Sequence, residues 1–374
     1  MNTTANLESG RSENIEWKQL WSLAALYASI VIGWIAYHNY QPKLLTKFNF
    51  TEFSLLLLIV QGIILSITPP IAGKLGDRFR FKEGHRLPII STGISFAAMI
   101  FMAVAFMLLS NPNEVFKWIL PILIIFWLIA MSIFTSPALS TLELFTPVEK
   151  LPRAMAVLTI VSNLVYSLEP IIIDLIDYLG APITFMVGGV AVFASGYALR
   201  KNSLSLFSSN KLKPVTEFKI DTQKSDYVFI LIAGMSLGLI TTILFNYYPE
   251  LLSSKLSSIT NGLDGKWVLV IMLVFSAAIS LPISNSVNKY GVLKVFWVST
   301  VVAMIAMGLM FSVNNAVIVL IFAIIFTIAF TAQSVSSLPL AISRANYYEK
   351  VYCVGIFFSG VAIPDGIVEV IQGM

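Results

Sequence analysis

The stretch Gly73-Lys-Leu-Gly-Asp-Arg-Phe-Arg-Phe-Lys-Glu-Gly-His-Arg-Leu-Pro88 is rich in charge, with more basic than acidic residues, and it separates two apolar blocks at about 52–72 and 88–109. A block of about 20 apolar residues is long enough for a helix to cross a hydrocarbon core of about 30 Å. The stretch therefore predicts a short charged connector between two membrane-spanning helices.

The same alternation of apolar blocks and short polar connectors continues along the chain of 374 residues. Of these residues, 57% are hydrophobic and only 12% are charged, whereas about a quarter of a soluble domain is charged. In lipid the backbone polar groups must be satisfied within each segment, so these spans are expected to be helices. The sequence thus predicts an all-α, polytopic membrane bundle of about eleven spans, at about 19–39, 52–72, 88–109, 118–140, 153–178, 182–199, 227–248, 267–286, 292–312, 316–340 and 351–371.

The distribution of basic residues predicts the orientation of the chain. With the N-terminus in the cytoplasm, all but five of the 24 Lys and Arg residues fall on the inner side. Cytoplasmic connectors are enriched in Lys and Arg. We therefore expect a multi-pass protein of the cell (inner or plasma) membrane with a cytoplasmic N-terminus, and a net charge of +4 that reflects topology rather than nucleic-acid binding.

Several functional classes find no support in the sequence. The single cysteine, Cys353, cannot form a disulfide or a thiolate cluster within the chain. The two histidines, His38 and His85, fall on opposite sides of the expected membrane. No nucleotide-binding loop or metalloprotease helix is present. We expect no enzyme activity, no cofactor and no metal.

The polar segment 1–16 lacks the features of a cleavable signal peptide.

The domain organisation follows from one long polar connector. It is rich in Lys and Ser and predicts a cytoplasmic linker at 201–225, between an N-terminal half at 17–200 and a C-terminal half at 226–374. A cytoplasmic tail at 1–16 precedes the first half. A weak repeat supports this division, because Pro70-Ile71-Ala72 and Pro282-Ile283-Ser284 close corresponding spans.

The connector at 73–88 resembles the signature loop of the major facilitator superfamily, Gly-x-x-x-Asp-Arg followed by Gly-Arg-Arg. Its extra length and Pro88-Ile89 look like the sucrose-transporter and glycoside–pentoside–hexuronide branch, with Gly76 in place of the usual Ser and His85 in place of one Arg. Weaker similarities to that branch are Gly33-Trp34, Pro42, Pro137-Ala138-Leu139, Glu143, Pro147, Arg153-Ala154, Gly355 and Ala362-Ile363-Pro364.

The resemblance implies two six-helix-like halves around a central cavity and secondary transport of a small solute, such as a sugar or glycoside, by alternating access. It also implies a twelfth span, which this sequence lacks. Two alternatives stay open. One is a non-transporting sensor or scaffold derived from a transporter, or a truncated remnant. The other is a lipid or drug translocator. Lipids, the solute and protons are the expected partners, and a monomer is expected.

The signature residues are expected to act as a conformational latch that holds the cytoplasmic side closed. Gly73 permits close helix approach, Asp77 can accept hydrogen bonds from backbone N–H groups, and Arg86 can reach the carboxylate of Glu143. The alternative is that these are solvated loop charges, which we prefer for Lys74, Arg80 and Lys82. The complete expected set is Gly73, Asp77, Arg78, Gly84, Arg86, Glu143 and Arg153.

Ionisable groups inside spans are functional candidates because burying them in lipid is costly. Glu169 ranks first, since Tyr166 and Asn163 precede it by three and six residues on roughly the same face. These groups could bind a hydroxylated solute or pass a proton. The alternative is a structural hydrogen bond near Pro170, which frees a backbone carbonyl.

A second candidate face lies on the first span, where Trp34, Tyr37, His38 and Gln41 follow helical spacing. Such a face could bind a sugar, but an interfacial aromatic belt has the same composition. Further cavity candidates are Gln61, Asn246 and Gln333, with helix–helix hydrogen bonding as the alternative for each.

Four acids are expected near the outer ends of two spans: Asp174, Asp177, Asp365 and Glu369. They could attract cations, although acids at helix ends commonly reach water, and we prefer that interpretation. The first two spans contain no acid within their cores, so the sodium-binding pattern of the melibiose-permease type is absent. If transport is proton-coupled, the candidates are Glu169 first, then Glu143 or His38.

Overall fold

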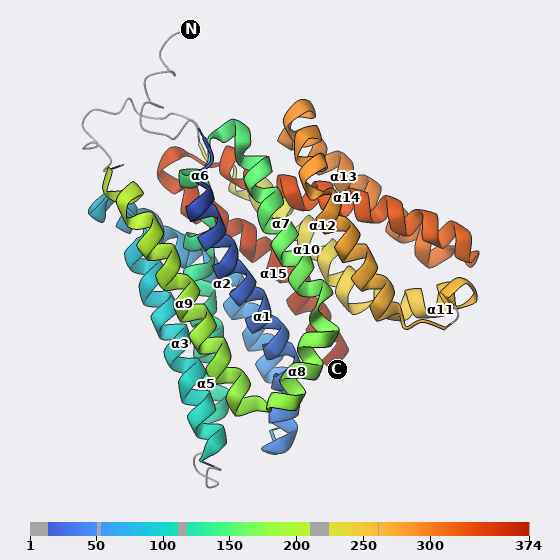
Figure 1. The fold of residues 1–374 in the computed structure, drawn as a ribbon, viewed down its shortest axis with the longest axis horizontal. Coiled ribbons are helices and arrows are strands. Elements are labelled where there is room, and N and C mark those ends of the chain that lie inside the picture. The colour runs from blue at the N-terminus through green and yellow to red at the C-terminus, as the bar shows by residue number, and fades with distance from the viewer. Residues whose placement is uncertain (1–13, 51–53, 111–117, 210–223, 261, 374) are drawn as a thin grey trace.

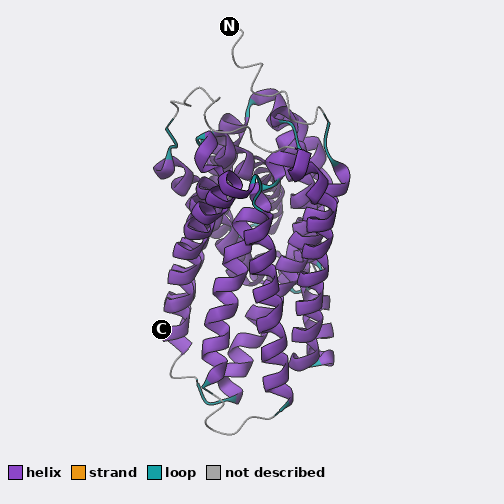
Figure 2. Ribbon diagram, turned by 90° about the vertical axis from the view of Figure 1, so that its left-hand side faces the viewer, coloured by secondary structure: helices purple, strands orange, loops and turns teal. Residues whose placement is uncertain are grey.

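The computed structural model of the chain describes residues 14–50, 54–110, 118–209, 224–260 and 262–373. Every regular element in these residues is a helix (Figures 1 and 2), so the expected all-α membrane bundle is confirmed. Ten of the described helices are long and apolar enough to cross a membrane, and one bent pair makes up to eleven.

The described helices of the first half run from the N-terminal end as α1 (Trp17–Lys47), α2 (Ser54–Glu83), α3 (Leu87–Leu109), α5 (Ile119–Ser140), α6 (Leu142–Phe145), η3 (Val148–Lys150), α7 (Leu151–Ser167), α8 (Glu169–Leu179) and α9 (Ala181–Ser209). Those of the second half are α10 (Tyr227–Asn246), α11 (Tyr248–Thr260), α12 (Gly265–Tyr290), α13 (Val292–Ser312), α14 (Ala316–Ser343), η5 (Tyr347–Glu349) and α15 (Lys350–Gly373).

The polar connector after the second span differs from the sequence prediction. The helix α2 continues through most of it and ends at Glu83. No proline interrupts this part of the chain, and the helix ends only where Gly84 adopts a positive φ of 80°, which glycine tolerates at helix C-termini. The charges of the connector are therefore held on a rigid helix rather than on a loop.

The fifth span is broken, although the sequence predicted one helix at 153–178. The helices α7 and α8 meet at Leu168 with a bend of 56°. Pro170 lies in the first turn of α8, where it fits a new helix but cannot continue the hydrogen bonding of the old one. The break leaves Glu169 at the N-terminus of α8.

The linker prediction falls partly on described residues. The helix α9 extends to Ser209, so the beginning of the expected 201–225 segment is helical. Residues 210–223 lie outside the described residues.

The buried hydrophobic residues of the described helices form four clusters, of which two are large. One large cluster is formed mainly by residues of α1 to α9, and the other joins α10 to α14. The helix α15 packs along α2, and α12 packs against α7, so these pairs connect the halves (Figure 1).

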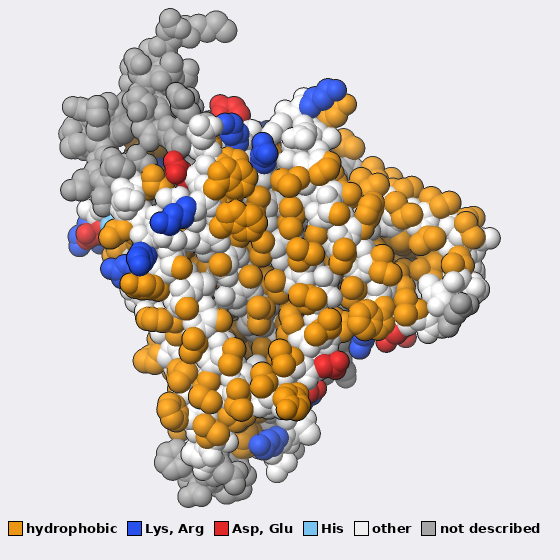
Figure 3. All heavy atoms as spheres, in the orientation of Figure 1, with side chains coloured by type: hydrophobic (Ala, Val, Ile, Leu, Met, Phe, Trp, Pro, Cys, Tyr) orange, Lys and Arg blue, Asp and Glu red, His pale blue; other side chains and the backbone are white. Residues whose placement is uncertain are grey.

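The flank of the bundle is apolar. Large hydrophobic side chains such as Phe106, Ile63 and Ile305 are more than half exposed, and Figure 3 shows hydrophobic side chains covering the middle of the molecule. Most Lys and Arg side chains in this view gather toward the end where α1 begins. We call that end, which contains the α2–α3 turn and the first turns of α7 and α15, the basic end.

Candidate functional site

A buried ionic cluster closes the basic end, with Glu143 at its centre. The Glu143 carboxylate accepts a hydrogen bond of 2.7 Å from Arg86 and another of 2.7 Å from Lys350. The Arg80 guanidinium lies 3.8 Å from the same carboxylate. Since Arg86 and Glu143 belong to the first half and Lys350 begins α15, the cluster joins the two halves at this end.

Arg86 is fully buried between α2 and α3. It also donates to the hydroxyl of Ser140 at 2.6 Å. Burial lowers the pKa of Arg86 from its usual value, whereas the adjacent Glu143 carboxylate acts in the opposite direction. A buried guanidinium needs such a partner, because removing a charge from water is costly without compensation.

A second contact at the basic end is an N-terminal cap across the two halves. The Asp77 carboxylate accepts hydrogen bonds from the backbone N–H groups of Val351, at 3.2 Å, and Tyr352, at 2.8 Å. These donors lie in the first turn of α15, where N–H groups have no partner within the helix. Gly73, one turn before Asp77, allows the two backbones to approach, because a Cβ there would clash with Val351.

Replacing Asp77 by alanine is expected to lower the free energy of unfolding by about 1 kcal/mol, the usual cost of losing an N-terminal cap. Asp77→Asn keeps one acceptor oxygen and should cost less. Thermal unfolding of the purified protein measures both. The control is Glu83→Ala, which removes an exposed carboxylate from the same helix and should have little effect. Equal stability of Asp77→Ala and Glu83→Ala would contradict the capping role.

The expected latch residues do not all take part in the ionic cluster or the cap. Gly84 forms the α2–α3 turn, while the side chains of Arg78 and Arg153 are exposed and lie outside the described cluster around Glu143. The sequence prediction for Arg80 was wrong. Its side chain is buried, lies 4.7 Å from the Tyr347 ring centre and donates to the Tyr347 carbonyl at 3.2 Å.

A cavity of about 780 Å³ lies between the halves. Its wall includes Lys266 and Trp267 at the start of α12, and Glu369 in the last turns of α15, all at the end opposite the basic end. The ionic cluster and the cap lie outside its lining. The molecule is thus closed at the basic end and hollow toward the other.

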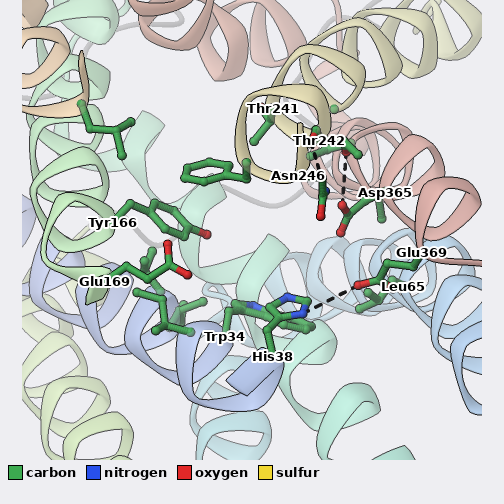
Figure 4. Close-up of a pocket in the computed structure, with 18 of the residues that line it drawn as sticks. Trp34, His38, Leu65, Tyr166, Glu169, Thr241, Thr242, Asn246, Asp365 and Glu369 are labelled. Carbon is green, nitrogen blue, oxygen red and sulfur yellow. Dashed lines mark hydrogen bonds and ion pairs between the residues drawn. The ribbon is translucent and has the colours of Figure 1, made fainter. Parts of the chain in front are cut away.

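Six of the residues predicted to form a substrate or proton pathway line this cavity. Tyr166 and Glu169 approach from the α7–α8 bend, opposite Asn246 on α10 and Asp365 on α15 (Figure 4). Trp34 and His38 form the adjoining wall from α1. Tyr166 lies in the last turn of α7 and Glu169 begins α8, so the two side chains come from opposite sides of the break at Leu168.

Apolar and aromatic side chains make up much of the remaining wall. The aromatic members, besides Trp34 and Tyr166, are Tyr27, Phe245, Trp267 and Phe358. The neutral hydrogen-bonding groups include Ser132, Thr135, Thr241 and Thr242. Such a mixture of apolar surface and a few polar groups is typical of small-molecule sites.

Two of the predicted cavity residues instead connect helices. Asn163 donates to the Ser276 hydroxyl at 2.8 Å, which bonds Thr331 at 2.6 Å and so connects α7, α12 and α14. Gln333 is fully buried and donates to Thr300 at 2.9 Å. Helix–helix hydrogen bonding, the alternative given for Gln333, describes the contacts of both residues.

Tyr37 and Gln61 also lie behind the cavity wall. The Tyr37 hydroxyl donates to the Gln61 side-chain oxygen at 2.5 Å, and its ring stacks on Trp127. The Gln61 amide donates in turn to Glu369 at 2.6 Å. This contact joins residues 308 positions apart, so local sequence spacing contained no signal for it.

The four outer acids have different environments. Asp177 is exposed and pairs with Lys43 at 2.7 Å, as expected for an acid at a helix end. Asp174, Asp365 and Glu369 line the cavity instead. Within the described residues, no group of three or more His, Cys, Asp or Glu side chains could hold a metal ion.

Comparison with known proteins places this geometry in context. The sequence profile described as Major Facilitator Superfamily matches residues 11–364. No curated protein matches the sequence.

Three solved structures illustrate the similarity of fold. The human organic anion transporter MFSD10 (TETRAN) has a TM-score of 0.66 at 11% identity, covering 96% of this chain and 93% of that chain. A bacterial homologue of the iron transporter ferroportin, in its outward-facing state, has a TM-score of 0.67 at 16% identity, with coverages of 95% and 91%. The proton:xylose symporter XylE has a TM-score of 0.61 at 13% identity, with coverages of 93% and 87%.

Proposed function

The chain belongs to the major facilitator superfamily, and from this premise we propose that it is a secondary active transporter that moves a small solute by alternating access. The observation that carries the proposal is the cavity of about 780 Å³ between the halves. It is closed at one end by the Glu143 cluster and the Asp77 cap. A cavity open toward one side is the arrangement that alternating access requires.

We also propose the side of the membrane to which the cavity opens. The basic end is assigned to the cytoplasm by the excess of Lys and Arg there, and the cavity then faces outward. We also propose that the protein lies in the cell membrane as a monomer surrounded by lipid. The latch then consists of Gly73, Asp77, Arg86 and Glu143, and it must separate before the cavity can open inward.

A sugar or glycoside is the proposed solute, on the basis of the resemblance to the sucrose-transporter and glycoside–pentoside–hexuronide branch. The aromatic faces of Trp34 and Tyr166 and the amide of Asn246 support this choice, because they offer an apolar plane beside hydrogen-bonding groups. We further propose that uptake is coupled to protons.

Transport is tested by uptake of labelled sucrose and labelled methyl glucoside into proteoliposomes that contain the full chain. We expect uptake that increases with an inward proton gradient. A folded protein that moves no sugar and no other solute in a broad screen would favour the sensor or scaffold alternative. Movement of labelled lipid or of a hydrophobic dye, without sugar uptake, would favour a lipid or drug translocator.

Replacing Trp34 by alanine is expected to raise the half-saturating solute concentration about tenfold, because an aromatic contact and its buried area are lost. The matched control is Trp21→Ala on the same helix, since Trp21 is 54% exposed and lies outside the cavity lining. Uptake assays over a range of solute concentrations measure both variants. Equal effects of the two substitutions would remove Trp34 from the proposed binding site.

An Asp77→Asn variant tests the latch in the same assay. The latch role predicts a change in transport rate, because one of the two bonds to α15 is lost in the closed form. Normal transport by this variant would count against that role.

A further inference from the structure

A chain of hydrogen bonds joins the two halves at the end opposite the ionic cluster. Tyr37 on α1 donates to Gln61 on α2, and Gln61 donates at 2.6 Å to one oxygen of Glu369 on α15. The other oxygen of Glu369 lies 3.7 Å from Nδ1 of His38 on α1. Glu369 and His38 line the cavity (Figure 4), whereas Gln61 is only 1% exposed.

The present arrangement suits an ionised Glu369. A carboxylate only accepts hydrogen bonds, and here it accepts from the amide nitrogen of Gln61. In this orientation the amide oxygen accepts from the Tyr37 hydroxyl. A charge-assisted bond of this kind is roughly twice as strong as a neutral one.

Protonation would remove the charge assistance from the Gln61–Glu369 bond, because a neutral carboxyl offers Gln61 only an uncharged acceptor oxygen. A neutral Glu369 has an O–H to donate, and Gln61 can accept it only by turning its amide so that the oxygen faces Glu369. The amide nitrogen would then face Tyr37, whose hydroxyl would have to accept rather than donate. Through such a turn, a proton on α15 would alter contacts within α1 and α2.

Other charged groups near Glu369 come from several helices. Asp365 lies one turn earlier on α15 and accepts from Thr242 of α10 at 3.2 Å. His38 and Tyr37 face Glu369 from α1. Across the cavity lie Glu169 and Asp174 of α8 and Lys266 of α12.

We propose that Glu369 is the carboxyl group that takes up and releases the coupling proton, with His38 as its neighbour on the cavity side. Gln61 is a positioning residue that transmits the protonation state to the first half. This inference rests on the proposed transport function, and it assigns the proton to Glu369 rather than to Glu169. Glu169 lines the same cavity but has no hydrogen bond or ion pair to another described residue.

The direction of the conformational effect follows from the bond that is lost. The ionised form holds α15 to α2 through the Gln61–Glu369 bond in the arrangement described here. Proton uptake weakens that bond, so it shifts the population away from this cavity-open form. Low pH is therefore expected to narrow the cavity mouth.

The test requires no solute. Cysteines for spin labels replace Leu109 at the end of α3 and Ser258 on α11, both exposed at the cavity end, in a Cys353→Ser background. Distances between the labels are measured in the full chain from about pH 5 to about pH 9. This range covers the titration of histidine and of carboxyl groups in buried sites. The wild-type distance distribution should shift to shorter values at low pH.

The variants separate the two carboxyl groups. Glu369→Gln should abolish the pH response and keep the short-distance population at all pH values, whereas Glu169→Gln and Asp177→Asn should retain the response. Gln61→Leu should retain proton uptake by Glu369, seen as its infrared carboxylic-acid band at low pH, but should uncouple it from the distance.

Three results would overturn the assignment: no pH response in the wild type, an unchanged response in Glu369→Gln, or a response lost in Glu169→Gln. A Glu369→Gln protein that only loses thermal stability and still responds to pH would assign Glu369 a structural role.

Parallel uptake assays distinguish a failure of this inference from a failure of the proposed transport function. Sugar uptake that does not respond to the proton gradient, in the wild type and in Glu369→Gln alike, would refute the proton site and leave transport standing. A pH-dependent distance that disappears in Glu369→Gln, without uptake of any solute, would leave the proton site standing and refute transport.

Discussion

Glu143→Gln is expected to destabilise the protein by about 3 to 5 kcal/mol, the range for removing one partner of a buried ion pair. The carboxylate is 3% exposed and is the common partner of Arg86, Lys350 and Arg80. Glutamine can keep a hydrogen bond but not the charge, so the fully buried Arg86 would lose its compensating carboxylate. Thermal unfolding in detergent measures the loss.

The same substitution is expected to open the basic end. Spin labels at Lys74→Cys and Lys289→Cys, which are exposed on α2 and α12, should report longer distances in Glu143→Gln than in the parent protein. Glu149→Gln is the matched control, because Glu149 is an exposed glutamate in η3, the short helix that follows α6. If the two variants had the same stability and the same label distance, the cluster would not hold this end closed.

Gly73→Ala is expected to have the second large effect. A Cβ at this position would lie 2.5 Å from the Val351 carbonyl oxygen and 2.7 Å from the Tyr352 Cα, closer than the 3.0 Å below which real Cβ atoms are essentially never found. Both neighbours are backbone atoms, which cannot rotate away. The helices α2 and α15 must therefore separate, at a cost of about 1 to 3 kcal/mol, as in other overpacked cores.

Gly308→Ala provides the control for this prediction. Gly308 is also within a helix, α13, but a Cβ there would meet nothing within 4 Å. This variant should be neutral or slightly more stable, because alanine favours a helix over glycine by about 1 kcal/mol. Gly73→Ala should also lengthen the distance between the labels at Lys74 and Lys289. A Gly73→Ala protein as stable and as closed as Gly308→Ala would contradict the close approach of α2 and α15.

The contacts between α2 and α15 differ at the two ends of the pair, so we expect the two ends to have different roles in transport. At the basic end the pair is held by a cap, an ion cluster and close glycine contacts, with Gly355 approaching Pro69 as well. At the cavity end it is held by the Gln61–Glu369 bond, beside the close approach of Gly62 to Gly366. Proton uptake at Glu369 would weaken only the Gln61–Glu369 bond. Opening of the basic end requires the cap, the ion cluster and the glycine contacts at that end to separate.

The sequence alone determined the features that depend on local composition. The apolar blocks predicted the spans because crossing a membrane requires about 20 apolar residues in a row. The motif around Asp77 and Arg86 indicated the family, and the family profile confirmed the superfamily. The expected pairing of Arg86 with Glu143 is present in the structure, because a buried guanidinium needs a carboxylate at that end.

Only the tertiary structure decided which polar groups face the cavity. Asn163, Tyr166 and Glu169 share a face in sequence terms, yet Asn163 bonds Ser276 while Tyr166 and Glu169 line the cavity. The burial of Arg80 and the bond between Gln61 and Glu369 depend on where α2 crosses α15. Helical periodicity indicates which residues share one face of a helix. Which helix packs against that face depends on contacts between residues far apart in the sequence, and no local pattern contains them.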